Sequence, residues 1–128
     1  MKIAVPTDVA DGMLGKRSGH FGHCKEFTLV DVENGAVTDV ARLENLPHAA
    51  GGCLAPVQLL KDHRVDSIVV GGMGANPFKR FAEVGIRVFF ADLEQCPDVQ
   101  SAIDSLLLGR LQEMRLQQLC KGSGNCHH

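Results

Sequence analysis

Apolar residues in the first 45 positions of the chain follow the spacing of strands. They alternate with polar residues or form short runs, and turn-forming residues bound each run. The segments expected as strands are Lys2–Pro6, Phe27–Val32 and Ala36–Leu43. The Asn34-Gly35 pair between the last two is typical of a tight hairpin. The first part of the chain therefore predicts an antiparallel meander.

From residue 54 onward, helix-spaced apolar patterns alternate with continuous apolar runs. The expected helices are Leu54–His63, Asn76–Val84 and Asp98–Leu119, each with a proline close to its start, where a missing N–H does no harm. The expected strands are Asp66–Gly71 and Ile86–Ala91, whose unbroken apolar character is typical of strands buried on both faces. This alternation predicts right-handed crossovers and a parallel core, and hence a three-layer α/β domain with a mixed sheet.

The domain organisation follows from these elements. Residues 1–119 are expected to form a single α/β domain, and the polar, Gly-rich residues 120–128 a flexible Cys/His-rich tail. The last expected helix has one apolar side, which packs on the sheet or serves a homodimer: Val99, Ile103, Leu106, Leu107, Leu111 and Met114. The alternatives of monomer and weak homodimer stay open.

Composition and charge narrow the function classes. Thirteen basic and fifteen acidic residues give a formal net charge of −2 without a long basic run, and Trp and Tyr are absent, so we expect no nucleic-acid partner. There is no long apolar run and the start does not resemble a signal peptide, so we expect a cytoplasmic protein without a membrane partner. Five widely spaced cysteines then indicate free thiols or metal ligands, not a disulfide framework.

The stretch SGHFGHC, residues 18–24, places His20, His23 and Cys24 within five positions. Imidazole and thiolate are ligands for Zn, Cu or Fe. The spacing HxxHC nevertheless matches no closed tetrahedral site, and a loop histidine that hydrogen-bonds to the backbone is the alternative. On the residues alone, the metal interpretation is narrowly favoured for His20 and the loop interpretation for His23.

Three Gly-rich loops are expected at the carboxyl ends of the strands, where open α/β sheets bind ligands: residues 7–22, 47–53 and 71–76. The GGMG stretch, Gly71–Gly74, lies between a strand and a helix and fits either an anion or a tight turn. Cys53 comes just before a helix, which stabilises a thiolate, although a small buried residue is an equal alternative. The tail offers further Cys and His ligands: Cys120, Cys126, His127 and His128.

The motifs SGHFGHCKEF, AGGCLAPVQLL and VVGGMGANPFKRFAEVGIRVF, in this order, resemble the dinitrogenase iron–molybdenum cofactor family over roughly residues 1–110. That family includes small carriers of nitrogenase cofactor precursors and the orange proteins, which hold a molybdenum–copper sulfide cluster. The resemblance implies a ribonuclease-H-like fold, consistent with the elements above, and a cluster cradled between the loops.

The resemblance also implies which residues contact the cofactor. These are Ser18, His20, Phe21, Gly22, Gly71, Gly72 and Gly74, and the same Gly-rich loops add Gly51, Gly52 and Met73 as candidates. The candidate metal ligands are His20, His23, Cys24, Cys53, Cys120, Cys126 and His127. Cys24, Cys53 and the tail go beyond the common core of the family, so the metal stays open among Mo, Fe and Cu with sulfide.

The leading hypothesis is therefore a non-enzymatic carrier or scaffold for a metal–sulfur cluster, with cluster donor or acceptor proteins as partners. A metal-dependent nuclease, suggested by the fold class alone, is the first alternative. It would need several converging carboxylates, and Asp8, Asp31 and Asp92 lie at or near expected strand ends, where an acidic residue is usually a turn or cap residue. A regulatory module that binds a small anion or nucleotide at GGMG is the second. Ligand binding by such a module would survive loss of His20 and Cys53.

Overall fold

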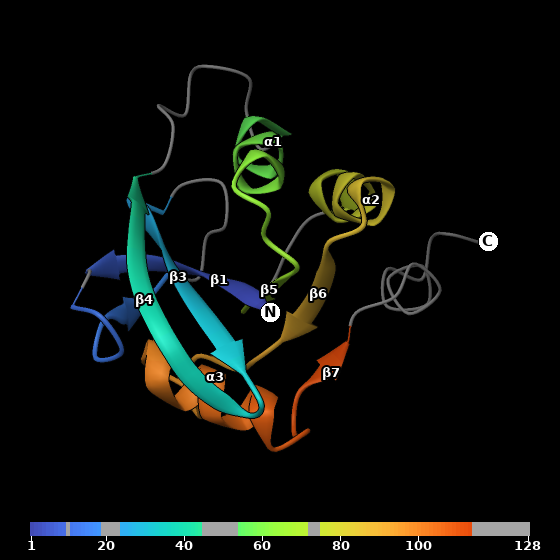
Figure 1. Ribbon diagram of the computed structural model, residues 1–128. Helices are drawn as coiled ribbons and strands as arrows, with labels where there is room; N and C mark the ends of the chain where they lie inside the picture. The colour runs from blue at the N-terminus through green and yellow to red at the C-terminus, as the bar shows by residue number, and fades with distance from the viewer. Residues whose placement is uncertain (10, 19–23, 45–53, 72–74, 114–128) are drawn as a thin grey trace.

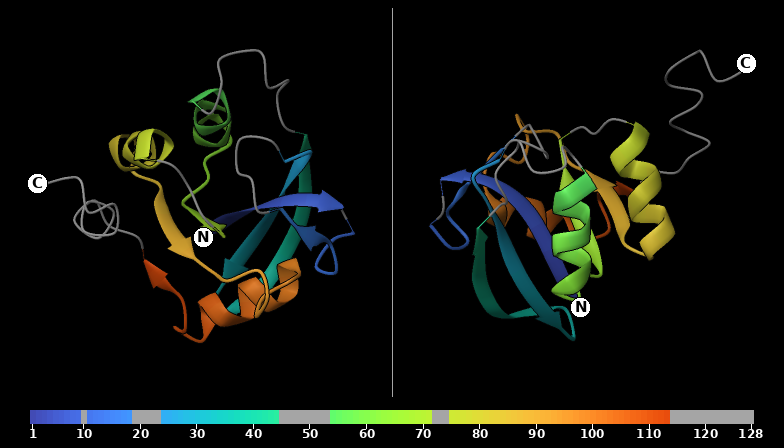
Figure 2. Two further views of the ribbon diagram at one scale, coloured as in Figure 1. Left: turned by 180° about the vertical axis from the view of Figure 1, so that it is seen from behind. Right: turned by 90° about the horizontal axis from the view of Figure 1, so that it is seen from above.

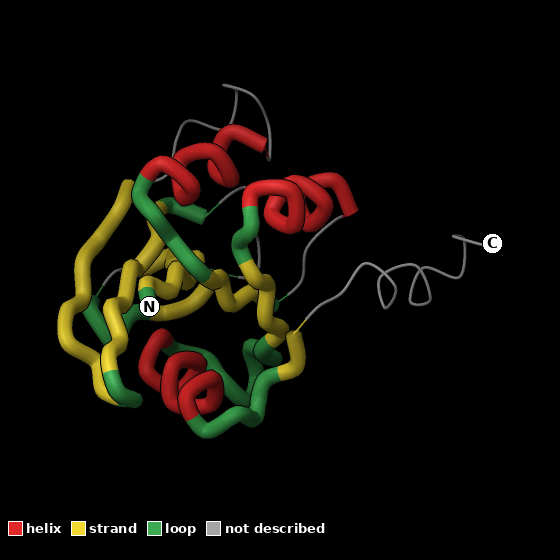
Figure 3. The backbone as a smooth tube through the Cα atoms, turned by 45° about the vertical axis from the view of Figure 1, so that its right-hand side comes forward, coloured by secondary structure: helices red, strands yellow, loops and turns green. Residues whose placement is uncertain are grey.

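The structure, a computed structural model, describes residues 1–9, 11–18, 24–44, 54–71 and 75–113. A mixed sheet separates two helices on one face from a third helix on the other, as Figures 1 and 3 show. The helices are α1 (Leu54–Asp62), α2 (Ala75–Val84) and α3 (Val99–Leu107). The strands are β1 (Lys2–Val9), β2 (Lys16–Arg17), β3 (Glu26–Glu33), β4 (Ala36–Glu44), β5 (Ser67–Val70), β6 (Arg87–Phe90) and β7 (Gln112–Glu113). The predicted three-layer α/β fold is confirmed.

Within the described segments, the strand order is β4-β3-β1-β5-β6-β7, and β2 pairs with the outer part of β1. Strand β3 is antiparallel to both β1 and β4, which confirms the meander. Strands β5 and β6 are parallel to β1, which confirms the parallel core. The hairpin turn uses Asn34 at φ 55° and Gly35 at φ 79°, the left-handed conformations that a type I′ turn needs.

Side-chain alternation along the strands divides the core into two layers. Ile3 and Val5 of β1 pack with Val99 and Ile103 of α3, whereas Ala4 belongs to the layer covered by α1 and α2. The two helices α1 and α2 lie side by side over that second layer (Figure 2). None of the described helices has the length and apolar character needed to cross a membrane.

The expected long helix from Asp98 to Leu119 is wrong between Leu108 and Glu113, and its residues 114–119, Met114 included, lie outside the described part of the chain. Helix α3 ends at Leu107, and Gly109 follows with φ 72°, a left-handed conformation that commonly terminates helices. The chain then turns back, and β7 pairs antiparallel with β6. Leu111 packs partly buried against the α3 layer, although it lies outside the helix. Its position fits the helical period, but the turn after α3 brings it to this layer.

The first strand was also predicted too short. Strand β1 continues through Pro6 to Val9, with Pro6 opposite Phe27 of β3. The sheet accommodates this proline, since its carbonyl still accepts a hydrogen bond from the Ser18 N–H at 2.9 Å. Strand β2 lies within residues 7–22, which were expected to be a loop throughout.

Helix α3 begins with a capping box. The Asp98 carboxylate accepts the Ser101 N–H at 2.8 Å, and the Ser101 hydroxyl accepts the Asp98 N–H at 3.3 Å. Hydrogen bonds from the side chain and then the backbone of Ser101 hold the pKa of Asp98 below its ordinary value. Because the pKa of Asp98 is depressed in the folded state, the ionised carboxylate stabilises the fold above the unfolded-state pKa. This stabilisation disappears as the pH falls through the folded-state pKa.

Substitution of this cap should give a pH-dependent loss of stability. In urea unfolding at pH 7, Asp98→Ala should lower the free energy of unfolding by about 0.5–2 kcal/mol, since one helix N–H loses its acceptor. The gap in unfolding free energy between wild type and variant should begin to narrow as the pH falls below about 4, the ordinary pKa of an aspartate, and should close through the lower pKa of folded Asp98. Asp104→Ala removes an exposed carboxylate of the same helix and should cost less. A difference between Asp98→Ala and wild type that does not change with pH would contradict this assignment.

Candidate functional site

Residues that flank two of the expected ligand loops lie at one end of the sheet. Ser18 is 3% exposed and its N–H binds the carbonyl of Pro6, which places it beside the carboxyl-terminal half of β1. Cys24 leads into β3, whose first residue, Glu26, pairs with Thr7 of β1. Glu44, the last residue of β4, pairs in turn with Glu26. The chain therefore enters residues 19–23 and 45–53 from the same end of the sheet, the one at which β1 terminates, which is called the carboxyl edge below.

Gly71 brings the third expected loop to this edge. It directly follows β5, which runs parallel to β1, so the carboxyl ends of both strands point the same way. A Cβ atom added at Gly71 would lie 3.1 Å from Cγ of Leu93, closer than ordinary van der Waals contact. Close packing against Leu93 therefore explains why residue 71 is a glycine. A further role of Gly71 in ligand binding stays a prediction.

Cys24 is the candidate metal ligand that falls within the described residues. It is 3% exposed and belongs to the apolar layer under α1 and α2, together with Phe27 and Leu60. Apolar surroundings disfavour the thiolate, the form that binds metal. The position of Cys24 thus favours packing, and its role as a ligand stays a prediction.

The remaining candidate residues lie outside the described part of the chain. They are His20, Phe21, Gly22, His23, Gly51, Gly52, Cys53, Gly72, Met73, Gly74, Cys120, Cys126 and His127. Within the described residues, no group of three or more His, Cys, Asp or Glu side chains is arranged to hold a metal ion. If the chain binds a metal, at least some ligands must therefore come from the other segments.

The three carboxylates of the nuclease alternative are not brought together. Asp31 pairs with Lys2 at the amino-terminal end of β1, whereas Asp8 lies near the carboxyl-terminal end of the same strand. Asp92 follows β6 at that second end, and its carboxylate accepts the Glu94 N–H at 2.9 Å. Because two-metal hydrolysis needs carboxylates that converge, this set does not form such a centre.

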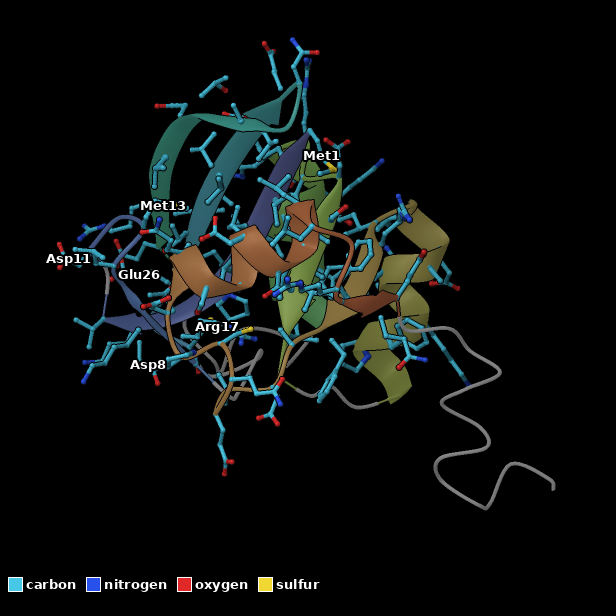
Figure 4. All side chains as sticks on the ribbon, turned by 90° about the horizontal axis from the view of Figure 1, so that it is seen from below. Met1, Asp8, Asp11, Met13, Arg17 and Glu26 are labelled. Carbon is cyan, nitrogen blue, oxygen red and sulfur yellow. The ribbon has the colours of Figure 1, made fainter. Side chains whose placement is uncertain are left out.

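A buried arginine at this edge was missed from the sequence. Arg17 in β2 is 6% exposed, and its Nη1 donates to the carbonyls of Ala91 at 3.1 Å and Cys96 at 2.8 Å. Its backbone N–H binds the carbonyl of Pro97 just ahead of α3, and Figure 4 shows Arg17 at the end of the molecule where the chain enters this helix. Arg17 thus ties β2 to the segment between β6 and α3.

The electrostatic setting of Arg17 is unusual. Burial lowers the pKa of its guanidinium, and the nearby Cys96 and Asp92 offset this effect in part. Among the described residues, its Nε and Nη2 atoms have no hydrogen-bond partner, and no carboxylate lies within ion-pair distance of Arg17. The sequence offered no signal for this residue, because Lys16-Arg17 in a Gly-rich stretch is typical of an exposed turn.

A pocket of about 400 Å³ lies past the carboxyl end of β6, on the side of α3. Its lining includes Asp92, Cys96, Ser105 and Arg110. The Cys96 Sγ lies 3.6 Å from the Ser105 Oγ at this place. None of the described residues predicted from the sequence to bind the cofactor lines this pocket, but its lining includes Ala91 and Cys96, whose carbonyls bind Arg17.

Comparison with known families decides the relationship of the chain. The model of the family described as "Dinitrogenase iron-molybdenum cofactor" matches residues 1–109. This chain belongs to the dinitrogenase iron–molybdenum cofactor family. The match covers every described element up to α3, so the whole three-layer domain belongs to the family fold.

Individual relatives agree with this assignment. An uncharacterized protein of Methanocaldococcus jannaschii is 30% identical over 117 residues, covering 88% of this chain and 91% of the relative. The apo form of the orange protein from Desulfovibrio gigas is 26% identical, with a TM-score of 0.73 and coverage of 88% and 92% of the two chains. A Thermotoga protein solved by NMR is 28% identical, with a TM-score of 0.71 and coverage of 90% and 97%.

Proposed function

We propose that this protein is a non-enzymatic carrier or scaffold for a metal–sulfur cluster of the iron–molybdenum or molybdenum–copper sulfide type. The observation that carries the proposal is that the described residues flanking the expected ligand loops lie together at one end of the sheet. Ser18, Cys24, Glu44 and Gly71, which flank residues 19–23, 45–53 and 72–74, all lie at the edge where β1 and β5 end. Membership of the family supports a cofactor-related role for this edge.

The chemistry of the residues fits a soft, sulfur-rich ligand. The segments entered from this edge contain His20, His23 and Cys53, whose imidazole and thiolate groups suit copper and iron. Glycine-rich backbone, as in residues 71–74, suits N–H contacts to an anion. Among the described residues, the unpartnered nitrogens of Arg17 add a positive group at the same edge. This donor set fits an anionic cluster held by a few soft ligands.

In this function the protein would receive the cluster from a donor protein and release it to an acceptor. The strands and helices would stay fixed, while binding and release would take place at the loops of this one edge. Such a carrier would need no general acid or base of its own.

The experiment is to determine metal and acid-labile sulfide in protein purified without oxygen, and to record its visible spectrum. Protein without metal is then loaded either with tetrathiomolybdate and Cu(I), or with iron and sulfide. We expect uptake near stoichiometry that is lost in His20→Ala and Cys53→Ala. His63→Ala serves as control, because His63 is exposed at the end of α1 and its Nδ1 lies 2.9 Å from the Leu59 carbonyl oxygen.

Two results would contradict the proposal. One is a colourless protein that takes up neither type of cluster. The other is phosphate or nucleotide binding that survives both His20→Ala and Cys53→Ala, which would favour the regulatory module instead.

A further inference from the structure

The pocket of about 400 Å³ beside α3, called the α3 pocket below, has no part in the proposed function. Its lining comes from three segments: the end of β6 with the turn that follows, helix α3, and the chain that returns from α3 to β7. Figure 1 shows this return, which brings β7 beside β6. The volume fits one small molecule, since ligand pockets commonly measure about 300–1,000 Å³.

Backbone hydrogen bonds fix each wall of the α3 pocket. Nη1 of the buried Arg17 holds the carbonyls of Ala91 at 3.1 Å and Cys96 at 2.8 Å. On the opposite side, the Arg110 N–H donates to the Ser105 carbonyl at 2.9 Å, and β7 pairs with β6. The pocket is therefore preformed, and a ligand need not order these segments in order to bind.

The lining of the α3 pocket carries one charge of each sign. Asp92 and Arg110 both line it, yet they form no ion pair with each other. Their charged groups are therefore separated across the pocket. A purely anionic ligand would be attracted by Arg110 but repelled by Asp92, and a purely cationic ligand would meet the reverse. A ligand with both an ammonium group and a carboxylate can satisfy both charges.

The two charges are not equally available. The Asp92 carboxylate accepts the Glu94 N–H at 2.9 Å. It also faces the charge of Arg17, since burial lowers the pKa of Arg17 while Cys96 and Asp92 raise it. Arg110 is exposed and forms no ion pair within the described part of the chain. We therefore expect Arg110 to contribute more to binding than Asp92.

One side of the α3 pocket is apolar. Ala91, Cys96 and Leu111 line the pocket and also belong to, or pack against, the apolar layer under α3. An apolar group of a ligand would be removed from water at this side. The pocket thus combines an apolar side with two opposite charges.

We propose that the α3 pocket binds a free α-amino acid with an apolar side chain. Its carboxylate contacts Arg110, its ammonium group contacts Asp92, and its side chain lies against Ala91, Cys96 and Leu111. The inference does not rest on the proposed function, because it concerns a different set of residues and a different class of ligand.

The first test uses three probes of the same carbon skeleton, titrated into wild type and followed by ¹H–¹⁵N NMR. They are L-leucine, 4-methylpentanoate, which lacks the ammonium group, and 3-methylbutylamine, which lacks the carboxylate. L-leucine should shift the backbone amide signals of Ala91, Ser105 and Leu111. It should bind at least about 3-fold more tightly than either analogue, since each analogue loses one charge contact and meets one repulsive charge.

Two variants test the charges one at a time. Arg110→Gln should bind L-leucine about 5- to 30-fold more weakly and should lose the preference for L-leucine over 3-methylbutylamine. Asp92→Asn keeps an acceptor for the Glu94 N–H and should weaken binding by about 2- to 5-fold. Arg64→Gln and Glu94→Gln are the matched controls, because both side chains are exposed and neither lines the pocket. Both controls should bind as wild type does.

Three results would overturn the inference. They are the absence of any shift at the solubility limit of L-leucine, equal affinity of wild type for L-leucine and one of its analogues, and unchanged affinity in Arg110→Gln. The proposed function fails separately: a wild type that binds L-leucine but takes up neither tetrathiomolybdate with Cu(I) nor iron with sulfide contradicts the carrier role alone.

Discussion

The Phe81→Ala variant should lose about 3–5 kcal/mol of the free energy of unfolding, a large share of the stability of a single domain. Phe81 in α2 is fully buried and packs in the layer that also contains Phe27 and Ile68. Its truncation removes apolar contacts and leaves a cavity that the surrounding strands and helices can fill only in part. The backbone of Phe81 is also held in place, because its carbonyl accepts a hydrogen bond from the Ile86 N–H at 2.9 Å.

The measurement is urea unfolding followed by circular dichroism, with Phe90→Ala as the matched control. Phe90 lies in β6 and is 42% exposed, so the same truncation there removes less buried surface and should cost less. Similar losses in the two variants would show that α2 is not anchored through Phe81. At temperatures where Phe81→Ala is still folded, tetrathiomolybdate binding should persist, since Phe81 lies outside the proposed site.

The elements that could be predicted from the sequence are those whose apolar pattern and turn chemistry agree. Asn34-Gly35 identified the hairpin because few other pairs tolerate left-handed conformation at both positions. The end of α3 could not be predicted in the same way. Leu111 has helical spacing from Ile103, but the turn at Gly109 and pairing with β6 fix its place, and both are contacts between distant parts of the chain.

For the candidate site too, features that follow from strand direction could be predicted, and features that depend on distant contacts could not. The carboxyl-edge rule predicted that the loops around Ser18 and Gly71 would lie together, because it needs only the direction of the strands. Arg17 could not be recognised, since its burial depends on carbonyls 74 and 79 positions away. A single arginine in a polar stretch carries no sequence pattern that distinguishes a buried side chain from an exposed one.

Two threonine hydroxyls near the proposed site should contribute unequally to stability. The Thr7 hydroxyl donates its single proton to the Val5 carbonyl at 2.7 Å, so the Thr28 hydroxyl, 2.8 Å away, must be the donor to Thr7. Thr7→Val would remove the acceptor and leave a buried hydroxyl group of Thr28 unsatisfied, at a cost of about 1–3 kcal/mol. Thr28→Val would remove only the outer donor, because Thr7 keeps its bond to Val5, and should cost less.

The double variant makes this order testable by urea unfolding. In a Thr28→Val background, Thr7→Val should lower the free energy of unfolding by less than it does in wild type, since no hydroxyl group is then left unpaired. Thr38→Val on the exposed strand β4 removes a weaker hydrogen bond to the Asp31 carbonyl and serves as control. Equal costs for the two buried threonines, or strict additivity, would show that Thr28 has another acceptor.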